Sequence, residues 1–590
     1  MKLILTLCLA SLLLLGTNIA TTASAAADAP RKPNVIIVLT DDQGYGDLSC
    51  HGNPVLKTPH LDRLHGESVR FTDFHVAPMC TPTRGQLMSG VDCLRNGAMN
   101  VSSGRTFLRR SLPTMADVFA SGGYHCGQFG KWHLGDNYPY RPQDRGFHET
   151  IHYPSSAIGS APDFWNNDYF DDTYSHNGRQ EKFHGYTTDV FFDEAMKWMR
   201  SQASAKKPFF CYLPTAAAHW PLFVPQKYRE LYKGQKPGVA SFFGMIGNID
   251  ENIGRLETFL AKTGLRDNTI VIFMTDNGGT VGVPLFNAGM KGGKTTLWEG
   301  GHRVPCFVRW PGGKLRAPGD VAELTQVQDI LPTLAELCTL PTRPNTRYDG
   351  VSLARLLRGE AEQLPDRMLV VNFSRLNDPQ PAKEGAAVLW KRWRLLPGRE
   401  LYDLATDPHQ DQNVIEKFPD IAAKMSAHLD AWWRETEPGI NDFGAVIIGN
   451  DAENPSLLAP PDWQDSFLDM GDQVRDGLRR NGLWNVIVDR AGDYQIELRR
   501  WPREADAGIT AALPAHKHTD GTFRPGVALP ITSARLKIAG FDETHAVTLD
   551  AKQVTFTVKL PAGRTQLQTW FSDKEGSEVA GAYYVHATRR

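Results

Sequence analysis

The chain has 590 residues, with 64 lysines and arginines against 66 aspartates and glutamates, so its formal net charge is −2 at pH 7. This length exceeds what one hydrophobic core usually organises, and two or three domains are expected. The charge balance near zero and the scattered basic residues exclude the electrostatic pattern of proteins that bind nucleic acid or anionic membranes.

Residues 1–25 have the pattern of a secretory signal peptide. A lysine precedes an apolar run over residues 3–16, and a small-residue cleavage pattern ends at Ala25. The apolar run is too short to span a bilayer, and no later stretch is long enough, so no membrane anchor is expected. We therefore expect an exported protein, periplasmic or secreted, whose mature chain starts near Ala26.

The cysteine count points to one cysteine with a special role. Eight cysteines are present, and Cys8 lies in the leader, which leaves seven. An odd number in an oxidising compartment requires at least one cysteine to stay unpaired or to be modified. No C-x-x-C sequence occurs, so a zinc or thioredoxin-type site has no support.

Residues 30–364 are predicted to form a catalytic α/β domain. Five short apolar runs, several of them rich in β-branched or aromatic residues, are typical of buried strands: 34–39, 125–130, 208–213, 269–274 and 305–310. Helical patterns over 187–202 and 244–264 lie between them. Strands that alternate with amphipathic helices indicate a mostly parallel sheet covered on both faces.

Three further segments follow this domain. Residues 365–438 have strand-like runs and then one helix, which predicts a small α+β subdomain, and the Gly/Pro/Asn-rich residues 439–461 are predicted to be a linker. Residues 462–590 alternate apolar and polar side chains between turn signals, as an antiparallel β-sandwich does. That sandwich could bind glycan, cover the rim of an active site or stabilise the fold, and its tryptophans are expected to be packing residues: Trp484, Trp501 and Trp570.

Polar side chains gather at the downstream ends of two predicted strands. Asp41 and Asp42 follow the first strand, and Asp276 and Asn277 follow a later one. Ligands of open α/β sheets bind at the carboxyl ends of the strands, and these hard oxygen donors suit Ca²⁺ or Mg²⁺. Either pair alone could merely cap the next turn, whereas two pairs in one sheet favour a metal.

Basic and imidazole side chains occur near other strand ends. Lys131 and His133 would point to the same face of an extended strand, and together they suit an anionic substrate. His219 follows a third strand, and Lys294 lies in the glycine-rich loop "KGGKTTLWEGG", which lacks the Walker spacing. Taken singly, each of these residues could be an ordinary polar strand end or surface loop.

The segment "CTPTRGQLMSG" (80–90) predicts a short helix with Cys80 at its N-terminus. Pro82 suits the first turn and Gly90 suits the end. Cys80 and Arg84 are four residues apart and should lie on one side of that turn. The helix dipole, the free N–H groups and the arginine favour an anion there, and they would favour a thiolate as well.

In combination, these residues resemble the type I, formylglycine-dependent sulfatases of the alkaline-phosphatase-like superfamily. Residues 80–84 match the C-x-P-x-R signature, and other motifs occur in the family's order between about residues 33 and 415. They include "NVIIVLTDDQGYGDLSCHGN", "GKWHLG", "TDNGG", "GGKTTLWEGGHRVP" and "ELYDLATDP". Several independent motifs in order make the resemblance specific, whereas a lone C-x-P-x-R would be weak.

The resemblance implies a large, mixed, mostly parallel sheet sandwiched by helices, followed by the small subdomain. It also implies that a dedicated maturation enzyme oxidises Cys80 to Cα-formylglycine during export, and that the hydrated aldehyde is the nucleophile. Arg84 would steady this group. One Ca²⁺ would be held by residues that match the family's ligands: Asp41, Asp42, Asp276 and Asn277, with the residue at position 80 completing the shell.

The same resemblance assigns the sulfate pocket to Lys131, His133, His219 and Lys294. The lysines and the metal would offset the charge of the ester as its S–O bond loosens. Asp276 would accept one proton of the diol and His133 the other. His219 and Lys294 would assist the leaving alcohol.

We therefore expect an arylsulfatase-like sulfuric ester hydrolase that releases inorganic sulfate, with a sulfated carbohydrate as the favoured substrate. One alternative is a formylglycine-dependent hydrolase of phosphonate monoesters or phosphodiesters. Another is a non-catalytic glycan-binding protein with a decayed site. The loop-rich residues 151–185 are the candidate insertion that shapes the substrate pocket. The sequence leaves open which sugar is bound and what the sandwich does.

Overall fold

The computed structural model describes residues 32–341 and 347–590, so the predicted signal peptide lies outside the described residues. Pro33–Arg590 makes up one unit of the structure. Over the described parts of the chain, no helix combines the length and apolar character needed to cross a membrane.

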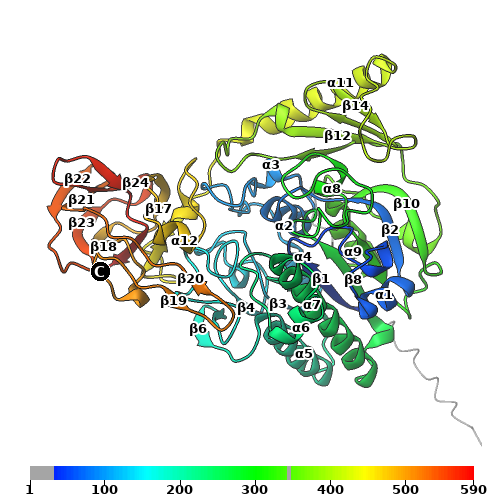
Figure 1. The fold of residues 1–590 in the computed structure, drawn as a ribbon, viewed down its shortest axis with the longest axis horizontal. Coiled ribbons are helices and arrows are strands. Elements are labelled where there is room, and N and C mark those ends of the chain that lie inside the picture. The colour runs from blue at the N-terminus through cyan, green and yellow to red at the C-terminus, as the bar shows by residue number, and fades with distance from the viewer. Residues whose placement is uncertain (1–31, 342–346) are drawn as a thin grey trace, which may run out of the picture. The chain divides into compact units, whose positions relative to one another are not determined.

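A ten-stranded mixed sheet lies at the centre of the part that the sequence predicts to be catalytic (Figure 1). Its order is β10 (Gly319–Gln326), β2 (Val69–His75), β9 (Cys306–Arg309), β8 (Thr269–Thr275), β1 (Asn34–Thr40), β7 (Phe209–Pro214), β3 (His125–Phe129), β4 (Glu149–His152), β5 (Thr173–His176) and β6 (Arg179–Lys182). Neighbours from β8 to β4 are parallel, whereas β9, β5 and β6 are antiparallel to their neighbours. The predicted mostly parallel sheet is confirmed.

Helices cover both faces of this sheet because its central strands are apolar on both sides. Along β1, Ile36 and Val38 belong to one buried cluster, and Val35, Ile37 and Leu39 to the other. The first cluster is closed by α1 (Pro59–Gly66), α5 (Thr187–Ser204) and α7 (Pro237–Lys262). The second is closed by α2 (Cys80–Ser89), α4 (Met115–Ser121), α9 (Ile330–Leu337) and α10 (Ala354–Arg358).

A small antiparallel sheet and one helix follow. The sheet has the order β11 (Leu369–Asn372), β12 (Ala386–Trp390), β13 (Trp393–Leu396) and β14 (Glu400–Asp403). The helix α11 (Pro419–Thr436) packs against it through Ala422 and Met425. This arrangement is the α+β subdomain that the sequence pattern predicts.

The C-terminal part consists mainly of two mostly antiparallel sheets. One contains β15 (Val446–Ile448), β17 (Leu483–Val488), β24 (Gly563–Ser572), β21 (Ser533–Ile538) and β22 (Phe541–Ala546), with β25 (Glu578–Ala580) beside β24. The other contains β16 (Ser456–Leu458), β26 (Tyr584–Arg589), β18 (Gly492–Arg499) and β23 (Val554–Leu560). Their inner faces form one buried cluster that includes Trp484 and Trp501, as expected of packing residues.

The predicted linker over 439–461 carries two of these strands. β15 pairs with β17 in a parallel register, and β16 pairs with β26. Each strand has only three residues, so the glycines, prolines and asparagines around them dominate the sequence pattern. The segment is therefore part of both sheets as well as a connection.

Candidate active site

The carboxyl ends of four neighbouring parallel strands bring the candidate residues together. β8, β1, β7 and β3 are consecutive in the sheet, so their ends lie at the same edge. The residues that follow them are Asp276 and Asn277, Asp41 and Asp42, His219, and Lys131 and His133. Residues far apart in the chain thus meet because the strands that precede them are adjacent.

Asp41 and Asp42 each face a lysine. Lys131 Nζ lies 2.6 Å from Asp41 Oδ2, and both side chains are fully buried. Lys294 Nζ lies 2.5 Å from Asp42 Oδ1, which also accepts a hydrogen bond from Asn277 Nδ2 at 3.0 Å. Burial tends to raise the pKa of Asp42, but Lys294 and His219 outweigh it and hold the pKa below its usual range. The structure therefore keeps the buried Asp42 carboxylate charged beside the Lys294 cation.

Asp276 pairs with Arg84. Arg84 Nη2 lies 2.6 Å from Asp276 Oδ2, both side chains are buried, and Arg84 Nη1 donates to the Lys131 carbonyl at 3.3 Å. The backbone N–H of Asp42 donates to Asp276 Oδ1. Burial and the nearby Asp41 raise the pKa of Asp276 to about 6. The arginine thus holds this carboxyl in place rather than pointing toward solvent.

Cys80 begins α2, as the sequence predicts. Gly90 ends the helix with a φ of 67°, the left-handed conformation that favours glycine. Cys80 is buried, and burial raises the pKa of its thiol. The seven cysteines within the described residues are all free. Because all seven are free, it is the position of Cys80 in the site, and not the odd cysteine count, that distinguishes it.

His133 faces Cys80 through a defined ring nitrogen. His133 Nδ1 lies 3.5 Å from Cys80 Sγ, and Nε2 lies 2.9 Å from the Val101 carbonyl, to which it donates. Burial and the neighbouring Lys131 lower the pKa of His133 well below its ordinary value. The neutral ring therefore carries its lone pair on Nδ1, toward Cys80.

One sequence expectation about this pair is wrong. Lys131 and His133 do not share a face of a strand, because β3 ends at Phe129. They lie in the loop that follows, where His133 has a φ of 60°. The loop turns Lys131 toward Asp41 and His133 toward Cys80.

His219 and Lys294 form the more open side of the site. Their side chains are 16% and 17% exposed, whereas that of Lys131 is fully buried. His219 Nδ1 lies 2.7 Å from the Trp220 carbonyl and donates to it, which leaves Nε2 facing Asp42 at 3.8 Å. Burial, Lys294 and Lys131 lower the pKa of His219 to about 4. A ligand would approach from this side.

The donor set fits a hard divalent cation. Asp41 Oδ1 and Asn277 Oδ1 are buried and have no hydrogen-bond partner among the described residues. Ligand atoms of Asp41, Cys80 and Asp276 lie within 4.8 Å of one another. Three carboxylates and an amide oxygen are the ligands that Ca²⁺ or Mg²⁺ prefers, and unpaired buried oxygens are costly without a partner.

Sequence reasoning missed a second buried polar network, outside this site. Arg394 on β13 binds Glu299 of α8 (Glu299–His302) at 2.7 Å and Asp73 of β2 at 3.0 Å. Asp73 also lies 2.9 Å from His75 Nε2, and His75 Nδ1 lies 2.9 Å from His302 Nδ1. Glu299 and His302 stand in the quoted "GGKTTLWEGGHRVP", but nothing in that pattern indicates a partner on β13.

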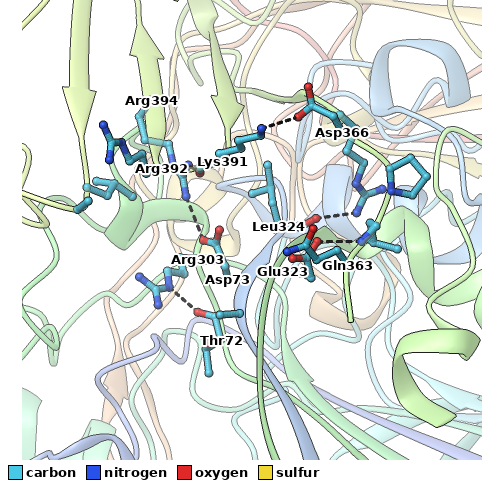
Figure 2. Close-up of a pocket in the computed structure, with 16 residues that line it drawn as sticks. Thr72, Asp73, Arg303, Glu323, Leu324, Gln363, Asp366, Lys391, Arg392 and Arg394 are labelled. Carbon is cyan, nitrogen blue, oxygen red and sulfur yellow. Dashed lines mark hydrogen bonds and ion pairs between the residues drawn. The ribbon is translucent and has the colours of Figure 1, made fainter. Parts of the chain in front are cut away.

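This network borders a cavity of about 670 Å³ between the large sheet and the small subdomain. Figure 2 shows its cations already engaged: Arg394 with Asp73, Lys391 with Asp366, and Arg303 with the Thr72 carbonyl. None of the candidate site residues lines it. The cavity is therefore a junction between two parts of the fold, separate from the candidate site.

Three partly buried apolar side chains that the sequence did not single out also reach the site. They pack against the cluster of Met79, Cys80 and Val101, and they are Phe373, Leu376 and Phe467. No periodicity or motif marks them: Phe373 and Leu376 lie in the loop after β11, and Phe467 lies far along the chain in the C-terminal part.

Comparison with known proteins finds sulfatases. A family model described as Sulfatase matches residues 33–340, and a model of the C-terminal part of N-sulphoglucosamine sulphohydrolase matches residues 293–435. Arylsulfatase A of Homo sapiens is 32% identical over 370 residues, which cover 57% of this chain and 70% of that protein. The ulvan-active sulfatase of Formosa agariphila is 28% identical over 432 residues, 68% of this chain and 81% of that protein.

A solved structure shares the fold. The crystal structure of Ps i-CgsB in complex with k-i-k-neocarrahexaose superposes with a TM-score of 0.62 at 25% sequence identity. The match covers 68% of this chain and 92% of that one.

Proposed function

Because the chain belongs to the sulfatase family of the alkaline-phosphatase-like superfamily and is a hydrolase of sulfate esters, we propose that it releases inorganic sulfate from a sulfated carbohydrate. In this proposal Cys80 is converted to formylglycine and one Ca²⁺ occupies the acidic cluster. The observation that carries the proposal is the convergence of Lys131, His133, His219 and Lys294 on Cys80 and three buried carboxylates.

The charges of the site suit an anionic ester. Lys131, Lys294 and Arg84 face Asp41, Asp42 and Asp276, so three cations balance three carboxylates. Asp41, Asp42, Asp276 and Asn277 would hold the cation. When bound, a divalent cation leaves this buried site with excess positive charge, which attracts the ester and offsets charge as the S–O bond breaks.

His133 would move a proton at position 80. Its Nδ1 faces the group on residue 80, and the Val101 carbonyl holds the tautomer that leaves this nitrogen unprotonated. A neutral imidazole within hydrogen-bond reach is the arrangement that general-base catalysis requires.

Lys294 and His219 would serve the leaving alcohol. Both lie on the open side of the site. Burial tends to lower the pKa of Lys294, but Asp42 outweighs burial and holds that pKa above its usual range. A charged Lys294 can hold a proton for the departing oxygen. Lys131, which is sealed inside, would bind sulfate oxygens instead.

The choice of a carbohydrate is supported by the names of similar proteins. One relative is described as ulvan-active, and a structural neighbour was solved with a neocarrahexaose. The proposal also places the enzyme outside the cytoplasm, where the leader pattern would direct it, with a maturation enzyme acting on Cys80 during export.

A direct test measures sulfate by ion chromatography after incubation with a panel of sugars. The panel contains the monosulfates of galactose, N-acetylgalactosamine and rhamnose, and sulfated oligosaccharides from ulvan and carrageenan. We expect release from at least one member by the full chain and none by Cys80→Ala. Equal release by Cys80→Ala, or no release from any member by the unaltered enzyme, would contradict the proposal.

Peptide mass spectrometry provides an independent check of the modification. In active enzyme, the peptide that contains residue 80 should lack the sulfur of cysteine. An intact Cys80 in fully active enzyme would rule out formylglycine as the nucleophile.

A further inference from the structure

Residues from three parts of the chain meet at Cys80. Met79, Cys80 and Val101 form a small buried cluster of the catalytic domain. Phe373 and Leu376, which follow β11 of the small subdomain, pack against it. So does Phe467, which lies between β16 and α12 (Gly471–Arg475) in the C-terminal part. The sandwich thus contributes an aromatic side chain to the surroundings of the nucleophile.

The backbone around Phe467 is anchored on both sides. Two residues before it, Asp465 binds Arg105 Nη2 at 2.8 Å, and its N–H donates to the Ser103 carbonyl. Two residues after it, Asp469 accepts a hydrogen bond from Ser156 Oγ at 2.7 Å. These contacts join the segment on both sides of Phe467 to loops of the catalytic domain. Phe467 therefore lies in a segment that is held in place at both ends.

Arg480 links the segment that carries Phe467 to the loop that carries Phe373. Its Nη1 donates to the Phe467 carbonyl at 3.0 Å, and its Nη2 reaches Asn377 Oδ1 at 3.4 Å. The loop that carries Phe373 is held from the other side, because Asn100 Nδ2 donates to Ser374 Oγ at 2.9 Å. These bonds link the segment that carries Phe467 to the loop that carries Phe373, and that loop to Asn100 of the catalytic domain.

We propose that Phe467 is a specificity-determining residue that contacts the sugar ring bearing the sulfate, so that the C-terminal sandwich forms a wall of the substrate pocket. This inference rests on the proposed function. Sulfate is recognised by charged groups, and Phe467 has none to offer. A partly exposed aromatic ring that packs against the cluster containing Cys80 instead suits the apolar face of a sugar ring.

The site of this contact lies outside the regions that the family models match, which end at residue 435. Asp469 supports it as a positioning residue. Its carboxyl is buried and accepts a hydrogen bond from Ser156 Oγ, which ties the backbone beside Phe467 to a loop of the catalytic domain. Of the three roles that the sequence leaves open for the sandwich, this inference selects a wall of the substrate pocket, formed by Phe467.

The test compares Phe467→Ala with the unaltered enzyme on the panel sugar that is hydrolysed fastest, and also measures inhibition by inorganic sulfate. We expect KM for the sugar to rise about tenfold, the loss for one aromatic contact. The Ki of inorganic sulfate should stay unchanged, because sulfate alone does not reach Phe467. Phe467→Tyr keeps the ring and should retain the KM of the unaltered enzyme.

Phe541→Ala is the matched control. Phe541 is a partly buried phenylalanine of the same sandwich that packs near Phe556 in its core, and its removal should leave KM for the sugar unchanged. Formylglycine content is measured in every variant, so that rates refer to matured enzyme.

The outcomes separate the two claims. An unchanged KM in Phe467→Ala, or equal losses for the sugar and for inorganic sulfate, would overturn the inference while leaving the sulfatase proposal intact. An unaltered enzyme that hydrolyses no sulfated sugar would overturn the proposed function and this inference with it.

Discussion

Replacing Arg394 by methionine should destabilise the junction between the large sheet and the small subdomain. Arg394 is buried and donates to Glu299 Oε1 at 2.7 Å. It also donates to Asp73 Oδ1 at 3.0 Å (Figure 2). Methionine fills much of the same volume but removes the charge. Glu299 and Asp73 would then remain buried without the cation that compensates their charge.

The expected loss follows from the state of Glu299. Burial tends to raise its pKa, but Arg394 and the nearby histidines outweigh burial and lower the pKa from 4.5 to about 2. A depression of this size corresponds to about 3 kcal/mol of stability at pH 7. Breaking one partner out of a buried ion pair costs about 3–5 kcal/mol. The pKa shift of Glu299 and the cost of a broken buried ion pair thus agree on a loss of at least about 3 kcal/mol.

The pH dependence has a definite sign. A carboxyl whose pKa is depressed by folding stabilises the protein above its unfolded pKa, and this stability is lost as the pH falls toward the folded pKa. The difference in free energy of unfolding between the unaltered protein and Arg394→Met should therefore be largest at pH 7 and should shrink between about pH 4.5 and pH 2.

Urea unfolding followed by tryptophan fluorescence measures this difference in free energy of unfolding. Arg394→Lys serves as a control that keeps a charge but loses the fork that reaches both carboxylates. Adding Glu299→Gln to Arg394→Met should recover part of the loss. A loss below about 1 kcal/mol at pH 7, or one that stays constant down to pH 3, would refute the reasoning.

Three further predictions concern the site and its support. His133→Ala should lower kcat for sulfate release by roughly 10²–10⁴, the usual contribution of a general base, and an unchanged kcat would exclude that role. Removal of divalent cations with EDTA should lower the melting temperature, and added Ca²⁺ should restore it, because the buried oxygens of Asp41 and Asn277 lose their partner. Asp47 is buried, which raises its pKa from 3.8 to about 7. The folded state then binds more protons between about pH 4 and 7, so stability should fall as the pH rises through this window, and Asp47→Asn should remove that slope of roughly 1.4 kcal/mol per pH unit. A pH–stability curve that is identical in both proteins would show that Asp47 is ionised throughout.

The central strands could be predicted from the sequence because each is buried on both faces. The apolar run over 34–39 corresponds to β1, and that over 269–274 to β8, within one residue at either end. A strand covered on both sides must be apolar throughout, so its boundaries coincide with the polar residues that follow. The same polar residues, Asp41 and Asp276 among them, are the candidate ligands.

Groups that act through distant contacts could not be predicted. The tautomer of His133 depends on the Val101 carbonyl, which any residue could supply. Phe467 lies 387 positions after Cys80 and follows no strand or motif that would mark it. Arg394 appears in the sequence as one more surface cation, and only the pairing of β13 with its neighbours brings it to Glu299 and Asp73.

The central claim is that this site hydrolyses sulfate monoesters. It is tested most directly by comparing kcat/KM for 4-nitrophenyl sulfate and for bis(4-nitrophenyl) phosphate on the same preparation of matured enzyme, with Cys80→Ala measured alongside. We predict a higher kcat/KM for the sulfate monoester and no turnover of either ester by Cys80→Ala. A preference for the phosphate diester would contradict the account and favour a diesterase built on the same residues.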